Sequence, residues 1–212
     1  MHEQRREEAE THQVGDFFHG EKRYYDRNFE ITVVKIFSGD CYVTHRPDEM
    51  MVTVLGSCVA ACVRDPLTGI AGINHFLLPG APGSFSRTHE AGARYGAFAM
   101  EQLINKALAL GASKDRLQVK VFGGANVIDN SAMIGGRNVE FVLDFLAREN
   151  LAITASDLGG DEPRRIHFYA GTGRVMMRKL RRKGDRRIIE MERQYESQIN
   201  SDTVDGDVEL FV

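Results

Sequence analysis

Cysteine is scarce in this chain, and the few thiols lack the spacing of a disulfide framework or a metal site. The three are Cys41, Cys58 and Cys62, an odd number with no pair at metal-type spacing. Cys58 and Cys62 stand in a run typical of a β-strand, which would place them about 13 Å apart, too far for a disulfide. At least one thiol therefore needs another explanation.

Long apolar runs and an excess of charge of one sign are also missing. No segment approaches membrane-spanning length, and the first residues do not resemble a signal peptide. The 27 basic and 30 acidic residues give a formal net charge of -3, which offers no general attraction for nucleic acid or an anionic membrane. We therefore expect a cytoplasmic protein that neither binds nucleic acid nor inserts into a membrane.

What the chain does contain is enough apolar sequence for one domain with flanking extensions. Of its 212 residues, 42% are hydrophobic. Residues 1–23 are charged and aperiodic, which predicts a mobile polar leader. The periodic apolar segments fall within 24–180, the expected domain. Residues 181–212 predict a charged extension that is partly helical or disordered.

Within the expected domain, the patterns predict an α+β fold. Helical spacing over 90–110 and 137–150 predicts two helices, the first ending at a C-cap glycine, Gly111. β-Branched and apolar runs predict strands at 31–40, 50–55, 57–64, 70–78, 117–124 and 151–160, and a hairpin over 165–180. Because strands outnumber helices and are mostly linked as hairpins, mostly antiparallel sheets fit better than a doubly wound parallel sheet.

The stretch TVLGSCVAACVRDPLTGIAGINHFLLPG places a cysteine and a histidine on the two strands of one predicted hairpin. Its centre, DPLTG, suits a type I turn. If the turn pairs Arg64 with Gly69, the register of the hairpin places Cys58 and His75 directly opposite each other. Their Cβ atoms would then be about 4.5 to 5.5 Å apart. A bulge at Gly69 would instead pair His75 with Val59.

A thiol beside an imidazole can act as a nucleophile with its base. The imidazole takes the thiol proton, and the thiolate attacks at neutral pH. A third group must orient the ring, and the nearby candidates are Thr53, Ser57 and Asn74. Backbone N–H groups around Gly56 and Ser57 would stabilise an oxyanion. The alternative interpretation is a small buried cysteine and a hydrogen-bonded histidine at a strand end.

Four blocks of the sequence resemble the CheD family of chemoreceptor glutamine deamidases. These are the stretch quoted above, KVFGGANV, IGGRNVEFVLDFL and ASDLGGDEPRRIHFYAGTGRV, in this order between Tyr24 and Leu180. The resemblance implies the cysteine hydrolase fold of deamidating bacterial toxins, with layered β-sheets and outer helices. It also implies a Cys-His-Thr set, with Cys58 as nucleophile, His75 as base and Thr53 as orienting residue.

The same resemblance implies the reaction and its partners. Specific glutamines on the cytoplasmic helices of methyl-accepting chemotaxis receptors would be hydrolysed to glutamate through a cysteine thioester, in chemotactic adaptation. A CheC-type CheY phosphatase is a partner of the family in several bacteria. Two alternatives stay open: a non-catalytic module that regulates such a phosphatase, and a receptor methyl-ester hydrolase that uses the same thiol.

The remaining motifs predict no cofactor and no metal. The FGGAN bend lacks the Lys-Ser/Thr of a phosphate loop, and its alternative interpretation is a simple turn. The residues that we expect to line a substrate groove are Asn74, Phe122, Gly123, Gly124 and Asn126. Cys41 and Cys62 are interpreted as packing residues.

Overall fold

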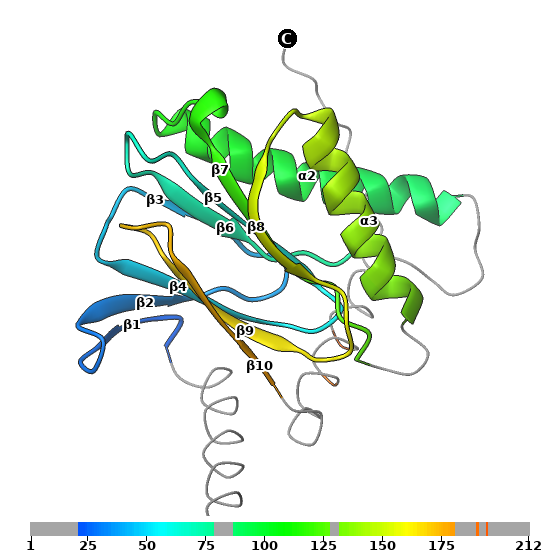
Figure 1. The fold of residues 1–212 in the computed structure, drawn as a ribbon, viewed down its shortest axis with the longest axis horizontal. Helices are drawn as coiled ribbons and strands as arrows, with labels where there is room; N and C mark the ends of the chain where they lie inside the picture. The colour runs from blue at the N-terminus through cyan, green and yellow to red at the C-terminus, as the bar shows by residue number, and fades with distance from the viewer. Residues whose placement is uncertain (1–20, 79–86, 128–131, 181–189, 191–193, 195–212) are drawn as a thin grey trace, which may run out of the picture.

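The computed structural model describes residues 21–78, 87–127, 132–180, 190 and 194. Over these residues the chain forms three layers: one β-sheet, a second β-sheet, and two helices on the outer face of the second sheet (Figure 1). This arrangement confirms the α+β prediction with layered sheets and outer helices. Most of the predicted leader and C-terminal extension lies outside the described residues, although Arg23 already begins the first strand.

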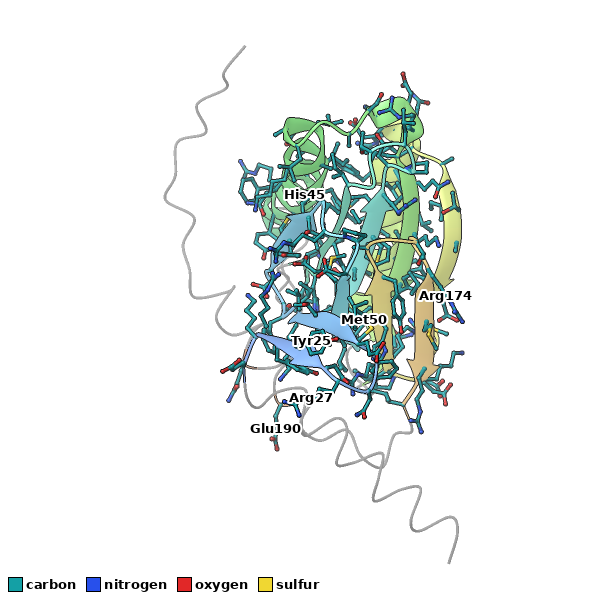
Figure 2. All side chains as sticks on the ribbon, turned by 90° about the vertical axis from the view of Figure 1, so that its left-hand side faces the viewer. Tyr25, Arg27, His45, Met50, Arg174 and Glu190 are labelled. Carbon is teal, nitrogen blue, oxygen red and sulfur yellow. The ribbon has the colours of Figure 1, made fainter. Side chains whose placement is uncertain are left out.

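The first sheet has five strands in the order β1-β2-β4-β9-β10. Their bounds are β1 Arg23–Asp26, β2 Ile31–Lys35, β4 Glu49–Leu55, β9 Arg164–Tyr169 and β10 Val175–Lys179. Only β2 and β4 pair in parallel, while the other neighbours are antiparallel. Figure 2 shows Tyr25 of β1 and Arg174, which precedes β10, toward opposite edges of this sheet.

The second sheet has five strands in the order β3-β6-β5-β7-β8 and carries the helices. Their bounds are β3 Cys41–Thr44, β6 Ala71–Asn74, β5 Val59–Arg64, β7 Gln118–Gly123 and β8 Ile153–Leu158. Its one parallel pair is β7 with β8. The helices are α2 Arg87–Ala109 and α3 Ala132–Arg148, and a short 3-10 turn, Lys114–Arg116, leads into β7.

Alternating side chains on the second sheet build two apolar layers. Val59, Ala61 and Val63 face α2 and α3, whereas Cys58, Ala60 and Cys62 belong to the layer between the two sheets. All three cysteines are free thiols, with Cys41 half-buried and the other two buried. Burial raises the pKa of the Cys62 thiol, so Cys62 is an inert packing residue, as expected.

The ends of the elements follow the expected local chemistry where the sequence signal was strong. Helix α2 ends just before Gly111, which has a φ of 110°. Gly111 N–H donates to Leu108 O at 2.9 Å, and Ala112 N–H donates to Ala107 O at 3.1 Å, a Schellman arrangement. The sequence patterns missed β1 and β3 because each has only four residues and shows no clean apolar alternation.

The hairpin between β5 and β6 has a different register from either of the two predicted ones. Val59 pairs with Phe76, and Cys62 pairs with Ile73. The turn closes with Asp65 N–H donating to the carbonyl of residue 70 at 2.9 Å, so residues 66–69 all belong to the loop. Direct opposition of Cys58 and His75 is therefore wrong, and so is the bulged pairing of His75 with Val59.

Candidate active site

Cys58 lies in the bend that connects β4 of the first sheet to β5 of the second, and only 2% of it is exposed. Three carbonyl groups of this bend accept hydrogen bonds. Gly56 O accepts from Ala125 N–H at 2.7 Å, and Cys58 O accepts from Gly124 N–H at 2.7 Å. Ser57 O accepts from Nδ2 of Asn138 at 2.8 Å. The bend is thus fixed to the segment that follows β7 and to α3.

These bonds also orient the N–H groups of the bend. In a trans peptide the C=O and N–H bonds point in opposite directions. With the carbonyls of Gly56 and Ser57 directed at Ala125 and Asn138, the N–H groups of Ser57 and Cys58 point away from those donors. The bend therefore fixes the direction of both N–H groups.

Two glycines of the predicted groove explain how closely the chain packs against Cys58 and α3. Gly123 has a φ of 116°, and a Cβ built there would lie 2.1 Å from the carbonyl oxygen of Cys58. Gly124 has a φ of 69°, and its Cβ would lie 2.3 Å from the side chain of Val139 on α3. Both positions require glycine for backbone conformation and for space.

His75 follows β6, and it faces the same layer as the thiol. It alternates with Ile73 and Leu77, which share the layer between the sheets with Cys58. In the observed register His75 and Cys58 are diagonal neighbours across the hairpin, a relation that spans about 7 to 8 Å between Cα atoms and stays within reach of long side chains. The hairpin therefore still brings the two side chains to one face.

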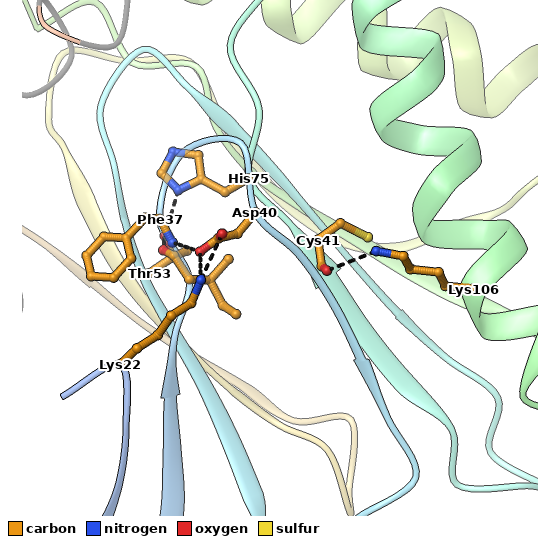
Figure 3. A network of polar contacts seen from close by, with 8 residues as sticks. Lys22, Phe37, Asp40, Cys41, Thr53, His75 and Lys106 are labelled. Carbon is orange, nitrogen blue, oxygen red and sulfur yellow. Dashed lines mark hydrogen bonds and ion pairs between the residues drawn. The ribbon is translucent and has the colours of Figure 1, made fainter. Parts of the chain in front are cut away.

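Thr53 orients the ring of His75 from the other sheet (Figure 3). Its Oγ1 lies 2.8 Å from Nδ1 of His75 and donates to Ile36 O at 2.7 Å. Because the hydroxyl has one proton and directs it at Ile36, it accepts the proton of Nδ1–H. Nε2 is then the unprotonated nitrogen, which is the tautomer that a base needs. Of the three orienting candidates, the structure places Thr53 against the ring.

The ring of His75 is neutral at physiological pH. Burial lowers the pKa of His75 to about 4, while the Ile36 carbonyl and the charge of Asp40 act in the opposite direction. Only 6% of the residue is exposed. A neutral imidazole is the form that can accept a proton from a thiol.

A loop at residues 36–40 holds the backbone of His75. His75 N–H donates to Asp40 O at 3.0 Å, and Gly39 N–H donates to His75 O at 2.7 Å. The carboxylate of Asp40 accepts from Phe37 N–H at 2.8 Å and pairs with Lys22 at 2.8 Å, as Figure 3 shows. The same loop brings Oγ of Ser38 to 3.7 Å from Sγ of Cys58. No sequence spacing pointed to Ser38, because the contact joins two separate connections between the sheets, from β2 to β3 and from β4 to β5.

Other predicted groove residues lie in different surroundings. Asn74 is 1% exposed, and its side chain accepts from Ala61 N–H of β5 at 2.9 Å and donates to Ala99 O of α2 at 2.9 Å. It therefore does not face His75. Phe122 is 6% exposed and packs between the sheets. Asn126 is half-buried, and its N–H donates to the carbonyl of residue 160 at 2.7 Å.

Asn138, which the sequence did not single out for the site, joins the bend to the segment after His75. Besides donating to Ser57 O, it accepts from Leu78 N–H at 2.9 Å, and it is fully buried. The signal that could have revealed it is an amide on the apolar face of an amphipathic helix. Such a residue is usually retained for its hydrogen bonds.

Asn138→Leu is expected to lower the free energy of unfolding by about 2 to 5 kcal/mol, because it leaves a buried carbonyl and a buried N–H without their partner. Urea unfolding at pH 7.5 measures the change. Glu140→Ala, on an exposed position of the same helix, is the control and should stay within about 0.5 kcal/mol of the wild type. Equal stability of the two variants would show that the hydrogen bonds of Asn138 do not stabilise the fold.

Within the part of the chain that the structure describes, no helix is long and apolar enough to cross a membrane. The same residues contain no group of three or more His, Cys, Asp or Glu side chains that could hold a metal ion.

Comparison with known proteins places this chain in one family. Residues 77–179 match the family described as CheD, chemotactic sensory transduction. A protein of Rhodopseudomonas palustris named "Probable chemoreceptor glutamine deamidase CheD" is 50% identical over 190 residues, which cover 90% of this chain and 89% of that protein. The protein of the same name from Bordetella avium is 53% identical over 163 residues, 75% of this chain and 70% of that one.

A third relative with this name, from Thiobacillus denitrificans, is 46% identical over 190 residues, 89% of this chain and 94% of that protein. Among solved structures, the Bacillus licheniformis hypothetical protein YfiH has a TM-score of 0.38 and 14% identity, over 69% of this chain and 68% of that chain. A likeness this low carries no argument about the fold.

Proposed function

The chain belongs to the CheD family, and we propose that it deamidates glutamine side chains of chemoreceptors in chemotaxis, through a thioester on Cys58. The names of the relatives supply the substrate class. The observation that carries the assignment of residues is the contact of Thr53 with His75, which leaves Nε2 as a proton acceptor on the face that holds Cys58.

The first half of the reaction forms the thioester. Nε2 of His75 takes the proton of the Cys58 thiol, and the thiolate attacks the amide carbon of the glutamine side chain. A C–S bond forms, and the carbonyl oxygen becomes an oxyanion held by the N–H groups of Ser57 and Cys58. Nε2–H then protonates the amide nitrogen, the C–N bond breaks and ammonia leaves.

The second half releases glutamate. The neutral ring of His75 takes a proton from water, hydroxide attacks the thioester, and the C–S bond breaks to restore the thiol with the proton from Nε2. Burial, which lowers the pKa of His75 to about 4, makes its imidazolium a strong acid. A strong acid suits the step that limits amide hydrolysis, which is protonation of a poor leaving group.

The proposal is tested by mass spectrometry of a receptor cytoplasmic fragment incubated with the full chain. Deamidation adds about 1 Da at each modified glutamine, whereas hydrolysis of a receptor methyl ester by the same thiol would remove about 14 Da. Binding without any mass change across several receptors would favour the regulatory module that binds a CheC-type phosphatase. A fragment with its glutamines replaced by glutamate is the matched control.

The wider expectations form part of the same proposal. Two mostly antiparallel sheets with outer helices support a relationship to the cysteine hydrolase fold of deamidating toxins. Residues 24–180 form the catalytic domain, and a cytoplasmic location follows from the substrate, the cytoplasmic helices of receptors. A CheC-type phosphatase is the proposed regulatory partner.

Thr53→Val is expected to lower kcat for deamidation by about 10- to 100-fold, because valine keeps the shape but cannot accept the proton of Nδ1–H. The ring then loses its preference for the active tautomer. The deamidation rate at pH 7.5 measures the effect, and Thr53→Ser, which keeps the hydroxyl, should recover most of it. Wild-type activity of the valine variant would remove Thr53 from the catalytic set.

A further inference from the structure

We propose that Ser38 is a further catalytic residue, whose hydroxyl donates a hydrogen bond to the thiolate of Cys58 and holds its sulfur in the attacking position. The inference rests on the proposed function, since it assumes that Cys58 is the nucleophile. Its structural basis is the 3.7 Å separation of Oγ and Sγ, a distance suited to a hydrogen bond with sulfur.

The loop that carries Ser38 is built to hold this position. Asp40 closes the loop, because its carboxylate accepts from Phe37 N–H at 2.8 Å and its own N–H donates to Phe37 O at 3.0 Å. Gly39 has a φ of 87°, a conformation that glycine adopts without strain. Nζ of Lys22 forms an ion pair with Oδ2 of Asp40 at 2.8 Å. The hydroxyl is therefore presented by a rigid turn.

The same loop contacts every member of the proposed catalytic set. The carbonyl of residue 36 accepts a hydrogen bond from the hydroxyl of Thr53. The backbone groups of residues 39 and 40 hydrogen-bond the backbone of His75. Ser38 completes the set with the contact to Cys58. A single loop thus fixes the orienting residue, the base and the sulfur relative to one another, and Figure 3 shows Phe37 and Asp40 of this loop beside His75 and Thr53.

The chemistry of the pair makes such a donor useful. Burial favours the neutral imidazole, because it lowers the pKa of His75 to about 4, so little positive charge faces the sulfur before a proton moves. Cys58 is itself buried, and a buried anion needs hydrogen bonds to be tolerated. A hydroxyl supplies one without adding a charge. As the thiol proton moves to Nε2, Ser38 keeps its own proton and directs it at the negative sulfur.

The test is the pH dependence of Cys58 alkylation by iodoacetamide, followed by peptide mass spectrometry so that Cys41 and Cys62 are counted separately. For Ser38→Ala we expect the midpoint to move up by about one pH unit and the rate at pH 7 to fall about tenfold. Ser38→Thr keeps a hydroxyl and should retain the wild-type profile. Ser113→Ala removes a hydroxyl that makes no side-chain cap bond, and it is the control for a remote serine.

The outcomes separate this inference from the proposed function. Rapid alkylation of wild-type Cys58 with an unchanged profile for Ser38→Ala overturns the role of Ser38 and leaves the deamidase standing. An equal shift in the alanine and threonine variants would indicate packing rather than hydrogen bonding and also overturns it. If wild-type Cys58 reacts no faster than Cys62 at neutral pH, the proposed nucleophile fails, and the role of Ser38 fails with it.

Discussion

Cys58→Ala is expected to abolish deamidation of a receptor fragment, with a loss of at least about 10³-fold in rate, while the protein stays folded. Without the sulfur no thioester can form, and water attacking the amide directly has no comparable nucleophile in the site. Truncation of one buried sulfur costs about 1 kcal/mol of stability, which a domain of this size tolerates. Mass spectrometry of the substrate and urea unfolding of the enzyme measure the two effects.

Cys62→Ala is the matched control for this experiment. Cys62 belongs to the same apolar layer and is 1% exposed, and its replacement by alanine also removes one sulfur atom. Burial raises the pKa of its thiol, so it is not a nucleophile, and its variant should deamidate at the wild-type rate. Activity that survives in Cys58→Ala and disappears in Cys62→Ala would reverse the assignment.

His75→Gln is expected to reduce the deamidation rate by about 10³- to 10⁴-fold. In the proposed reaction the ring activates the thiol, protonates the leaving ammonia and activates water. General acid–base catalysis typically contributes about 10²- to 10⁴-fold in rate. Glutamine has a similar length and can still hydrogen-bond Thr53, so the loss reports chemistry. Rates of substrate deamidation and of Cys58 alkylation should both fall.

The same variant is expected to remove part of the acid sensitivity of the fold. The folded-state pKa of His75 is about 4, below the usual value of 6.5, so the unfolded chain binds a proton between these pH values and the folded chain does not. The contribution of neutral His75 to the free energy of unfolding is therefore fully present above pH 6.5 and is lost as the pH falls toward 4. The total loss is roughly 3 kcal/mol, of which about 2 kcal/mol falls between pH 7.5 and 5.

Urea unfolding at pH 7.5 and 5 checks this expectation. The drop in the free energy of unfolding between the two pH values should be about 2 kcal/mol smaller in His75→Gln than in the wild type. Burial also lowers the pKa of His167 to about 4, so His167→Gln shows how much of the remaining drop comes from another histidine. Identical pH dependence in the wild type and His75→Gln would show that His75 is not held neutral.

Several elements were predictable because their signals are local. Gly111 ends α2 where a residue with positive φ is needed, and the apolar runs of β4, β5 and β7 mark strands that are covered on both faces. The sharing of one face by Cys58 and His75 was also predictable, although through a wrong register. The predicted loop, residues 65–68, and the observed loop, residues 66–69, are equally long, but a turn that begins one residue later alters every pair in the hairpin.

The rest of the site depends on contacts between segments far apart in the chain. Thr53 and His75 belong to different sheets, Ser38 reaches Cys58 from the loop between β2 and β3, and Asn138 reaches the bend from α3. No periodicity or motif encodes such distances, because they result from how two sheets and a helix pack together. Local sequence was thus sufficient for the α+β class and for placing Cys58 and His75 on one face. The hydrogen bonds that orient and hold them arise only when the layers close around the buried pair.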